Sequence, residues 1–288
     1  MIEFATVLEI VHAVFSRRIK NIQLLNRRET LEYAINNNCS ISRLGDGELD
    51  IVLHRKGTYF QRYDERLREK LTNILYIPKS NVLVCLDHEF MCSNKYYVVL
   101  DYERSIKKYY RYLSIFKTND VAILDRKKQK IHLYFKLLLI GNKTEITSYG
   151  DATCFMLCFF YQDYLQKKMI EIIELYRKYF AKKKILFVCS DNPTLGVSFR
   201  KLYENGIIKS AKSIDFVVIP SKNCFDYYET ILKQILSFRN IDAVFIQAGP
   251  TATVLVADLT TQYGLLSYDV GSWNVSLQKA ADVHNITF

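Results

Sequence analysis

The sequence has few of the features that mark secreted, zinc-binding or membrane proteins. Its seven cysteines are an odd number without a Cys-x-x-Cys pair, which argues against a disulfide framework or zinc ribbon and indicates a reduced, cytosolic compartment. Cys154 and Cys158 lack neighbouring ligands and are interpreted as buried thiols. No run reaches the roughly eighteen uncharged apolar residues of a membrane span, and the N-terminus lacks a signal peptide's cationic start and cleavage site. We therefore expect a soluble or peripheral protein.

Linkers and repeats are also lacking. With four prolines in 288 residues and no low-complexity tract, no domain boundary is evident. We predict a single domain over 1–288, with an N-terminal helical segment over 1–38 and an α/β core over 39–288 that carries a helical insertion near 100–140. An expected helix over 2–15 has an apolar side, which suits packing on the domain, a contact between copies of the chain or a membrane surface.

Acidic residues are outnumbered, since 40 Lys and Arg against 30 Asp and Glu leave a formal charge of +10. The basic residues occur in short clusters, which are either solvated faces or an attraction for anions such as anionic lipid or phosphorylated substrates. Charge alone is weak support for nucleic-acid binding, which we do not expect.

Short β-branched runs alternate with longer amphipathic segments. The expected strands are 39–43, 82–86, 121–124, 185–189, 214–219, 243–247 and 265–269. The expected helices include 49–54, 64–75, 102–115, 128–140, 153–180, 225–238 and 252–263. This alternation predicts an α/β, Rossmann-like fold, with a largely parallel sheet, helices on both faces and added helical segments. Ligands of such sheets bind beyond the carboxyl ends of the strands.

The most unusual segment, Ser42 to Glu48, follows the first expected strand. In an extended turn, Asp46 and Glu48 project to the same side and place two carboxylates on one hard cation, Mn²⁺ or Mg²⁺. Gly45 and Gly47 leave room for a phosphate, and Arg43 offers it a bidentate contact. The alternative is an ordinary Asp-Gly turn at a helix start. The third glycine of a dinucleotide fingerprint and the Walker lysine are both missing.

A second segment, 243–253, reads as a buried strand that runs into a helix. Gly249 permits the turn, Pro250 suits the first helical turn and Thr251 is expected to cap the amides, which makes an anion site or simply a capped helix. Further polar groups at strand ends are expected to converge on the same rim. The donor-binding candidates are Arg43, Gly45, Gly47, Gln61, Tyr63, Asp191, Lys222, Asn223, Gly249, Pro250, Thr251, Ala252 and Thr253.

Taken in order, these segments resemble the GT-D-type glycosyltransferases of bacterial adhesin and surface-polysaccharide glycosylation. The resemblance runs through residues 42–53, 59–64, 219–228, 249–259 and 268–271. It implies a GT-D-type Rossmann-like sheet, a UDP-sugar donor, and Mn²⁺ or Mg²⁺ held near Asp46 and Glu48.

The chain departs from the family pattern after Gly271, where the family tends to have His and an acidic residue and this chain has Ser272-Trp273-Asn274. The usual candidates for the catalytic base are therefore missing. Asp269, at the end of the last expected strand, is the nearest remaining carboxylate, and Asp151 is the second choice. The alternative is that Asp269 only caps a loop or orients a backbone amide.

The sequence thus predicts a cytoplasmic glycosyltransferase with the catalytic residues Asp46, Glu48 and Asp269. Its expected reaction moves a hexose from a nucleotide-diphosphate sugar to a glycan, glycoprotein or lipid-linked acceptor. A peripheral contact with the inner face of an anionic membrane and a homo-oligomer are left open. The alternative function is a non-catalytic nucleotide-sugar-binding subunit of another transferase.

Overall fold

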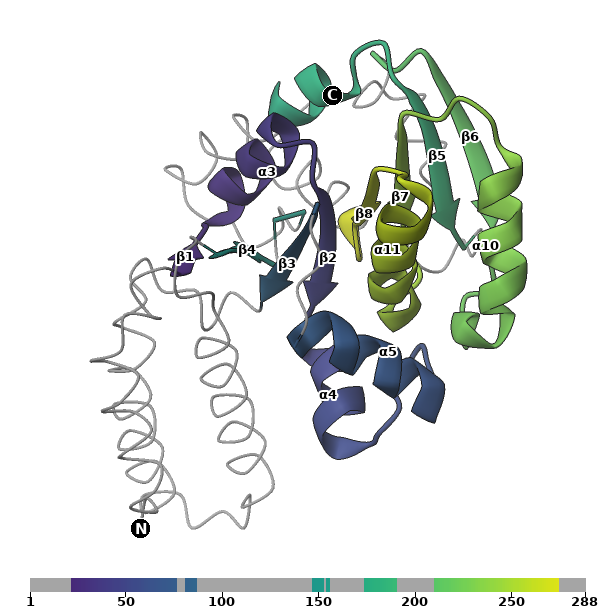
Figure 1. Ribbon diagram of the computed structural model, residues 1–288. Helices are drawn as coiled ribbons and strands as arrows, with labels where there is room; N and C mark the ends of the chain where they lie inside the picture. The colour runs from purple at the N-terminus through teal and green to yellow at the C-terminus, as the bar shows by residue number, and fades with distance from the viewer. Residues whose placement is uncertain are drawn as a thin grey trace, which may run out of the picture.

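The fold is built around one parallel sheet (Figure 1). The computed structural model describes residues 22–76, 81–86, 147–152, 154–155, 174–190 and 210–274. Within these ranges the strands are β1 (Ile22–Leu24), β2 (Ser40–Leu44), β3 (Val82–Leu86), β4 (Thr147–Asp151), β5 (Lys184–Cys189), β6 (Ser213–Val218), β7 (Ala243–Ile246) and β8 (Ser267–Asp269). The helices are α3 (Arg27–Asn36), α4 (Asp46–His54), α5 (Glu65–Tyr76), η3 (Cys224–Tyr227), α10 (Tyr228–Ser237) and α11 (Pro250–Tyr263), with a further helical stretch over 174–180.

The described strands lie in the order β1-β4-β3-β2-β8-β7-β5-β6, and each neighbouring pair is parallel. Their carboxyl ends therefore meet at one edge. From β2 the chain continues through β3 and β4 to one side, whereas β7, β5 and β6 lie on the other side of β8. In open α/β sheets, ligands bind at the carboxyl edge where the strand order changes direction in this way. In Figure 1, α4 and α5 lie beyond this edge of β2 and β3.

The alternation of side chains along the strands divides the core into two layers. In β3, Val84 and Leu86 pack with α5, α10 and α11, whereas Leu83 and Cys85 pack with α3 and the helical stretch over 174–180. The prediction of helices on both faces of a largely parallel sheet is confirmed.

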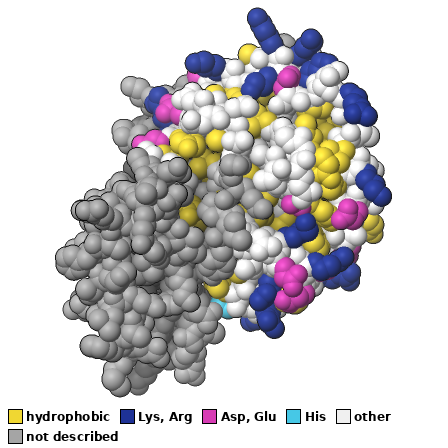
Figure 2. Space-filling view, viewed as in Figure 1, with side chains coloured by type: hydrophobic (Ala, Val, Ile, Leu, Met, Phe, Trp, Pro, Cys, Tyr) yellow, Lys and Arg dark blue, Asp and Glu magenta, His cyan; other side chains and the backbone are white. Residues whose placement is uncertain are grey.

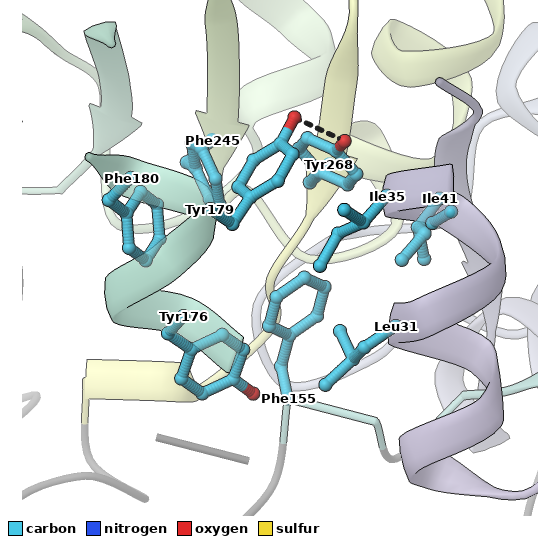
Figure 3. A pocket seen from close by; sticks show the side chains of 10 residues that line it. Leu31, Ile35, Ile41, Phe155, Tyr176, Tyr179, Phe180, Phe245 and Tyr268 are labelled. Atoms are coloured by element: carbon cyan, nitrogen blue, oxygen red, sulfur yellow. Dashed lines mark hydrogen bonds between the residues drawn. The ribbon is translucent and has the colours of Figure 1, made fainter. Parts of the chain in front are cut away.

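An apolar gap in the second layer lies between α3 and the helical stretch over 174–180 (Figure 3). Leu31, Phe155 and Tyr176 line it, and the hydroxyls of Tyr179 and Tyr268 lie 2.5 Å apart at its side. Its space of about 20 Å³ is room for roughly one water molecule. The gap is therefore a packing feature of the core.

The structure differs from the sequence-based expectation at several elements. Residues 22–24, inside the N-terminal segment expected to be helical, form β1 and pair with β4, and neither strand was predicted. The helix expected over 153–180 is wrong at 154–155, which form a turn. The elements expected at 2–15, 102–115, 121–124 and 128–140 lie outside the described residues. None of the described helices is long and apolar enough to cross a membrane.

The charged side chains do not form one continuous basic patch on the face shown in Figure 2. Lys and Arg are spread around the rim of the described surface, with Asp and Glu among them. The basic clusters at 17–18, 107–108 and 126–128 lie outside the described residues.

Candidate active site

The segment that links β2 to α4 starts its helix earlier than the sequence suggested. α4 begins at Asp46 rather than at residue 49, with Gly45 as its N-cap. Successive helical residues rotate by about 100°, so residues two apart do not project to the same side and the extended turn expected for Asp46 and Glu48 is wrong. The reason is capping: Glu48 Oε2 accepts a hydrogen bond of 2.8 Å from the Gly45 amide. For Asp46 the structure describes the backbone only, so its metal-binding role stays a prediction.

Arg43 is the most informative side chain at this edge. It lies on β2, and its Nε and Nη1 atoms are buried without a hydrogen-bond partner among the described residues. The guanidinium rests against Gly271, since a Cβ added there would meet Arg43 Nη1 at 2.2 Å. Gly271 also has a φ of +51°, which favours glycine. Two donor nitrogens of Arg43 are therefore enclosed by protein at the carboxyl edge with their hydrogen-bonding capacity unused within the described part of the chain.

Asp269 lies at the end of β8, next to β2, and is buried. Its Oδ1 accepts from the Gly271 amide at 3.0 Å, and its Oδ2 lies 3.2 Å from Thr253 Oγ1, which also donates to the Arg43 carbonyl at 2.9 Å. Burial raises the pKa of Asp269, although the positive charge of Arg43 opposes the shift. These contacts fix the carboxylate close to Arg43.

Glu48 completes a charged cluster with these two residues. Burial, and then the negative charge of Asp269, raise the pKa of Glu48 to about 7. Burial disfavours the charged form of Arg43 and lowers the pKa of its guanidinium. The negative charges of Asp269 and of other neighbours, Glu48 among them, outweigh this effect, so the pKa is raised on balance. The positive charge of Arg43 thus acts on two acidic groups that repel each other. Among the described residues no group of three or more His, Cys, Asp or Glu is placed to hold a metal ion, so the predicted metal stays a prediction.

The first turn of α11 closes the same site from the other side. Gly249 is the N-cap with a φ of +54°, Pro250 follows at the first helical position, and Ala252 N donates to the Gly249 carbonyl at 2.8 Å. Thr251 does not cap the helix as expected, because its buried Oγ1 points to Gln61 Oε1 at 3.5 Å. The helix end, including Thr253 beside Asp269, is nonetheless held at the carboxyl edge as predicted for an anion site.

The loop between α4 and α5 covers this helix end. Gly47 lies under the loop, since a Cβ there would meet Thr58 Cγ2 at 3.0 Å and Pro250 Cγ at 4.0 Å. The close approach at Gly47 is therefore made by protein, and not by the phosphate that the sequence suggested. Gln61 is buried, and its Oε1 accepts from the Phe225 amide at 3.1 Å.

Three of the remaining donor-binding candidates lie in or beside the loop between α4 and α5. Tyr63 donates to Glu65, the first residue of α5. Asn223 accepts from the Arg62 amide at 2.8 Å, and Lys222 is exposed. Asp191 lies outside the described residues. Asp151, the second candidate for the base, is buried at the end of β4, where its Oδ2 lies 3.8 Å from Arg27 Nε.

The comparisons with known proteins agree with this geometry. The family model described as "Glycosyltransferase GT-D fold" matches residues 41–278. The chain belongs to the GT-D glycosyltransferase family. The family expected from the sequence is thereby confirmed.

A relative of this GT-D chain is also named as a glycosyl transferase. The probable glycosyl transferase Gly of Streptococcus gordonii is 24% identical over 256 residues, which are 88% of this chain and 32% of that protein. The chain thus spans about a third of that relative's length.

Solved structures also match. One, of the highly conserved domain of unknown function 1792 and reported to have a distinct glycosyltransferase fold, is 26% identical with a TM-score of 0.64, over 97% of this chain and 87% of that one. Another, a glycosyltransferase from Streptococcus sanguinis, is 21% identical with a TM-score of 0.65, over 92% and 87%, and supports the fold.

The departure of this GT-D chain after Gly271 has a structural explanation. Trp273 is fully buried in the second core layer, where it stacks on Phe180 and Phe245 and meets Tyr176 edge to face. Asn274 accepts a hydrogen bond of 2.8 Å from Gln247. These residues complete the core below the site, and sequence reasoning missed this role because it treated them only as absent catalytic groups.

Proposed function

We propose that the protein transfers a hexose from a nucleotide-diphosphate sugar, UDP-glucose or a similar UDP-sugar, to a hydroxyl of a glycan, glycoprotein or lipid-linked acceptor. The biological setting that we propose is bacterial surface-polysaccharide or adhesin glycosylation. The observation that carries this proposal is the pair of buried, unpartnered N–H groups of Arg43 beside the carboxylates of Asp269 and Glu48.

Arg43 is suited to the diphosphate of the donor. A buried donor without a partner costs about 1–3 kcal/mol, and a phosphate oxygen removes that cost. A guanidinium donates strong hydrogen bonds to phosphate oxygens, and the amides of the first turn of α11 would add a favourable dipole. Negative charge grows on the diphosphate as its bond to the sugar breaks, so these groups bind the transition state more strongly than the donor.

A divalent cation fits the acidic side of the cluster. The pKa of about 7 for Glu48 reflects burial and the nearby charge of Asp269, and a cation there would relieve both. Carboxylate oxygens are the ligands that Mn²⁺ and Mg²⁺ prefer. We propose that Asp46 and Glu48 hold the ion, which would supply Lewis-acid stabilisation of the leaving diphosphate.

Asp269 is the proposed base. In a direct displacement, the acceptor oxygen forms a bond to the anomeric carbon while the bond from that carbon to the diphosphate oxygen breaks. The acceptor proton passes to a carboxylate within hydrogen-bond reach, and the Gly271 amide and Thr253 hydroxyl hold Asp269 in position for this.

The second candidate function is a nucleotide-sugar-binding subunit without transfer activity. It is favoured by Trp273 and Asn274, which serve the core where the family tends to have polar catalytic candidates. Donor hydrolysis separates the two, because many transferases slowly pass the sugar to water and a binding subunit does not.

Thermal unfolding with a panel of nucleotide sugars, with and without Mn²⁺, tests the proposal. A ligand at one hundred times its Kd adds about 2.7 kcal/mol to the free energy of unfolding. We expect one donor to stabilise the wild-type protein only with Mn²⁺, and Arg43→Gln to lose this effect. Arg62→Gln is the matched control, because that side chain is largely exposed. No stabilisation by any donor, or full stabilisation of Arg43→Gln, would contradict the proposal.

We further propose peripheral binding at the cytoplasmic face of an anionic membrane, supported by the charge of +10. Flotation with phosphatidylserine-containing liposomes at low salt measures this binding. Absence of the protein from the floated fraction would contradict it.

A further inference from the structure

Two neighbouring aromatic side chains at the rim of the site face solvent. Tyr59 is 76% exposed and Phe60 is 43% exposed, and their rings meet edge to face with centroids 5.0 Å apart. Core packing does not account for rings at this exposure. Adjacent exposed aromatic side chains beside a ligand site are typical of a binding surface.

The loop that carries these rings is held in place from both sides. Within it, Thr58 N donates to the Gln61 carbonyl at 2.7 Å, and Gln61 N donates to Thr58 Oγ1 at 3.1 Å. Across to η3, Asn223 N donates to the Phe60 carbonyl at 2.7 Å, and Asn223 Oδ1 accepts from Arg62 N. The backbone under the rings is therefore fixed, which reduces the entropy lost when a ligand binds them.

The rings lie directly beside the proposed diphosphate site. A Cβ added to Gly249, the N-cap of α11, would lie 3.9 Å from Phe60 Cβ. Thr58, from the same loop, packs against Gly47. A nucleoside whose diphosphate lies at the first turn of α11 is thus within reach of the rings.

The ammonium group of Lys222 already covers part of the aromatic surface. Lys222 Nζ lies 4.4 Å from the centroid of the Tyr59 ring. This contact orients the exposed ring and adds a positive charge at the outer side of the site. The ring and the ammonium together suit a flat heterocycle that is attached to an anion.

We propose that the face of the Tyr59 ring is a stacking platform for the nucleobase of the donor, with Phe60 perpendicular to it and Lys222 bracing it. This inference rests on the proposed function. The nucleobase suits the platform better than the acceptor does, because the acceptor hydroxyl must reach Asp269, which is buried and held by Thr253 and the Gly271 amide. Phe60 instead lies at Gly249, the N-cap of α11.

The test distinguishes contacts to the nucleobase of the ligand from contacts to its phosphates. Calorimetric titration with Mn²⁺ present measures the affinity of the wild-type protein for UDP, ADP, GDP, CDP and inorganic pyrophosphate. The tightest nucleoside diphosphate is then measured with Tyr59→Ala, Tyr59→Phe and the control Tyr263→Ala. Tyr263 is 45% exposed and ends α11, at the far end of the helix from Gly249.

We expect Tyr59→Ala to weaken the nucleoside diphosphate by about 5- to 150-fold, the range measured for loss of one base–aromatic stack. Pyrophosphate affinity should stay within about twofold of wild type, because its contacts to Arg43 and α11 are untouched. Tyr59→Phe keeps the ring and should bind as the wild type does, as should Tyr263→Ala.

Other outcomes overturn the assignment. Wild-type affinity of Tyr59→Ala for the nucleotide, including when sugar transfer is lost, would place the platform at the acceptor or outside the site. An equal loss for pyrophosphate would assign Tyr59 to the phosphate end. These ratios test the platform alone, whereas failure of the wild-type protein to bind any nucleoside diphosphate would refute the proposed function and the platform together.

Discussion

Replacing Gly271 with alanine probes the charged cluster without removing any charged group. The new Cβ would lie 2.2 Å from Arg43 Nη1 and 2.7 Å from Cζ and Nη2, so the guanidinium must move. Because φ at this position is +51°, the backbone is strained as well. The backbone term alone is about 1–2 kcal/mol, which lowers Tm by a few degrees in a chain of this size.

The displacement of Arg43 has a separate effect on ligand binding. Hydrogen bonds to charged groups contribute about 1.5–3 kcal/mol each, so loss of one Arg43 contact weakens pyrophosphate or nucleotide affinity by about 10- to 150-fold. Calorimetric titration with Mn²⁺ present measures this loss, and thermal unfolding measures the stability.

Gly264→Ala is the matched control. Gly264 also has a positive φ, +66°, but an added Cβ has nothing within 4 Å. We expect both variants to lose stability and only Gly271→Ala to lose anion affinity. If Gly271→Ala binds pyrophosphate as tightly as Gly264→Ala does, Arg43 is not the anion ligand and the reasoning about the cluster fails.

Three further predictions concern the base, the loop and the tyrosine pair. Asp269→Asn should lower turnover by about a hundredfold or more with donor affinity nearly unchanged in steady-state kinetics, and normal turnover would remove Asp269 from the mechanism. Gln61→Leu leaves the Phe225 amide without its buried acceptor and should lower the free energy of unfolding by about 1–3 kcal/mol in urea denaturation. An unchanged midpoint would show that this hydrogen bond does not stabilise the loop. Burial raises the pKa of Tyr179 to about 12, so its contribution to stability is complete below about pH 10 and is lost as the pH rises through 12. Tyr179→Phe should therefore show a shallower loss of stability across this range, and parallel curves for the two proteins would contradict it.

Much of the fold was accessible from the sequence because the central strands are continuous apolar runs. β3 and β7 are buried at every described position, and their neighbours are separated by amphipathic helices. β1 was missed because it has only three residues, and β4 because its sequence, Thr-Ser-Tyr-Gly-Asp, has few β-branched or apolar residues. Gly150 in β4 is explained only by packing, since a Cβ there would lie 2.4 Å from Cys85 Sγ.

The site was accessible in part. The sequence placed Arg43, Glu48 and Asp269 at strand ends, and parallel pairing of β2 with β8 brings these ends together. The helical start at Asp46 could have been read from Glu48, which stands three residues after the N-cap Gly45 and accepts its amide. The contact of Arg43 with Gly271 was inaccessible, because it joins segments far apart in the chain and depends on the turn after β8.

Release of nucleoside diphosphate from a panel of nucleotide sugars tests the central claim most directly. The assay compares the wild-type protein with Arg43→Gln and Arg62→Gln, with and without Mn²⁺ and in the absence of an acceptor. We expect slow, Mn²⁺-dependent release of nucleoside diphosphate from one donor by the wild-type protein and by Arg62→Gln. We expect little release by Arg43→Gln. A donor that binds the wild-type protein but is never hydrolysed would identify a binding subunit, and release that is undiminished in Arg43→Gln would contradict the role of the charged cluster.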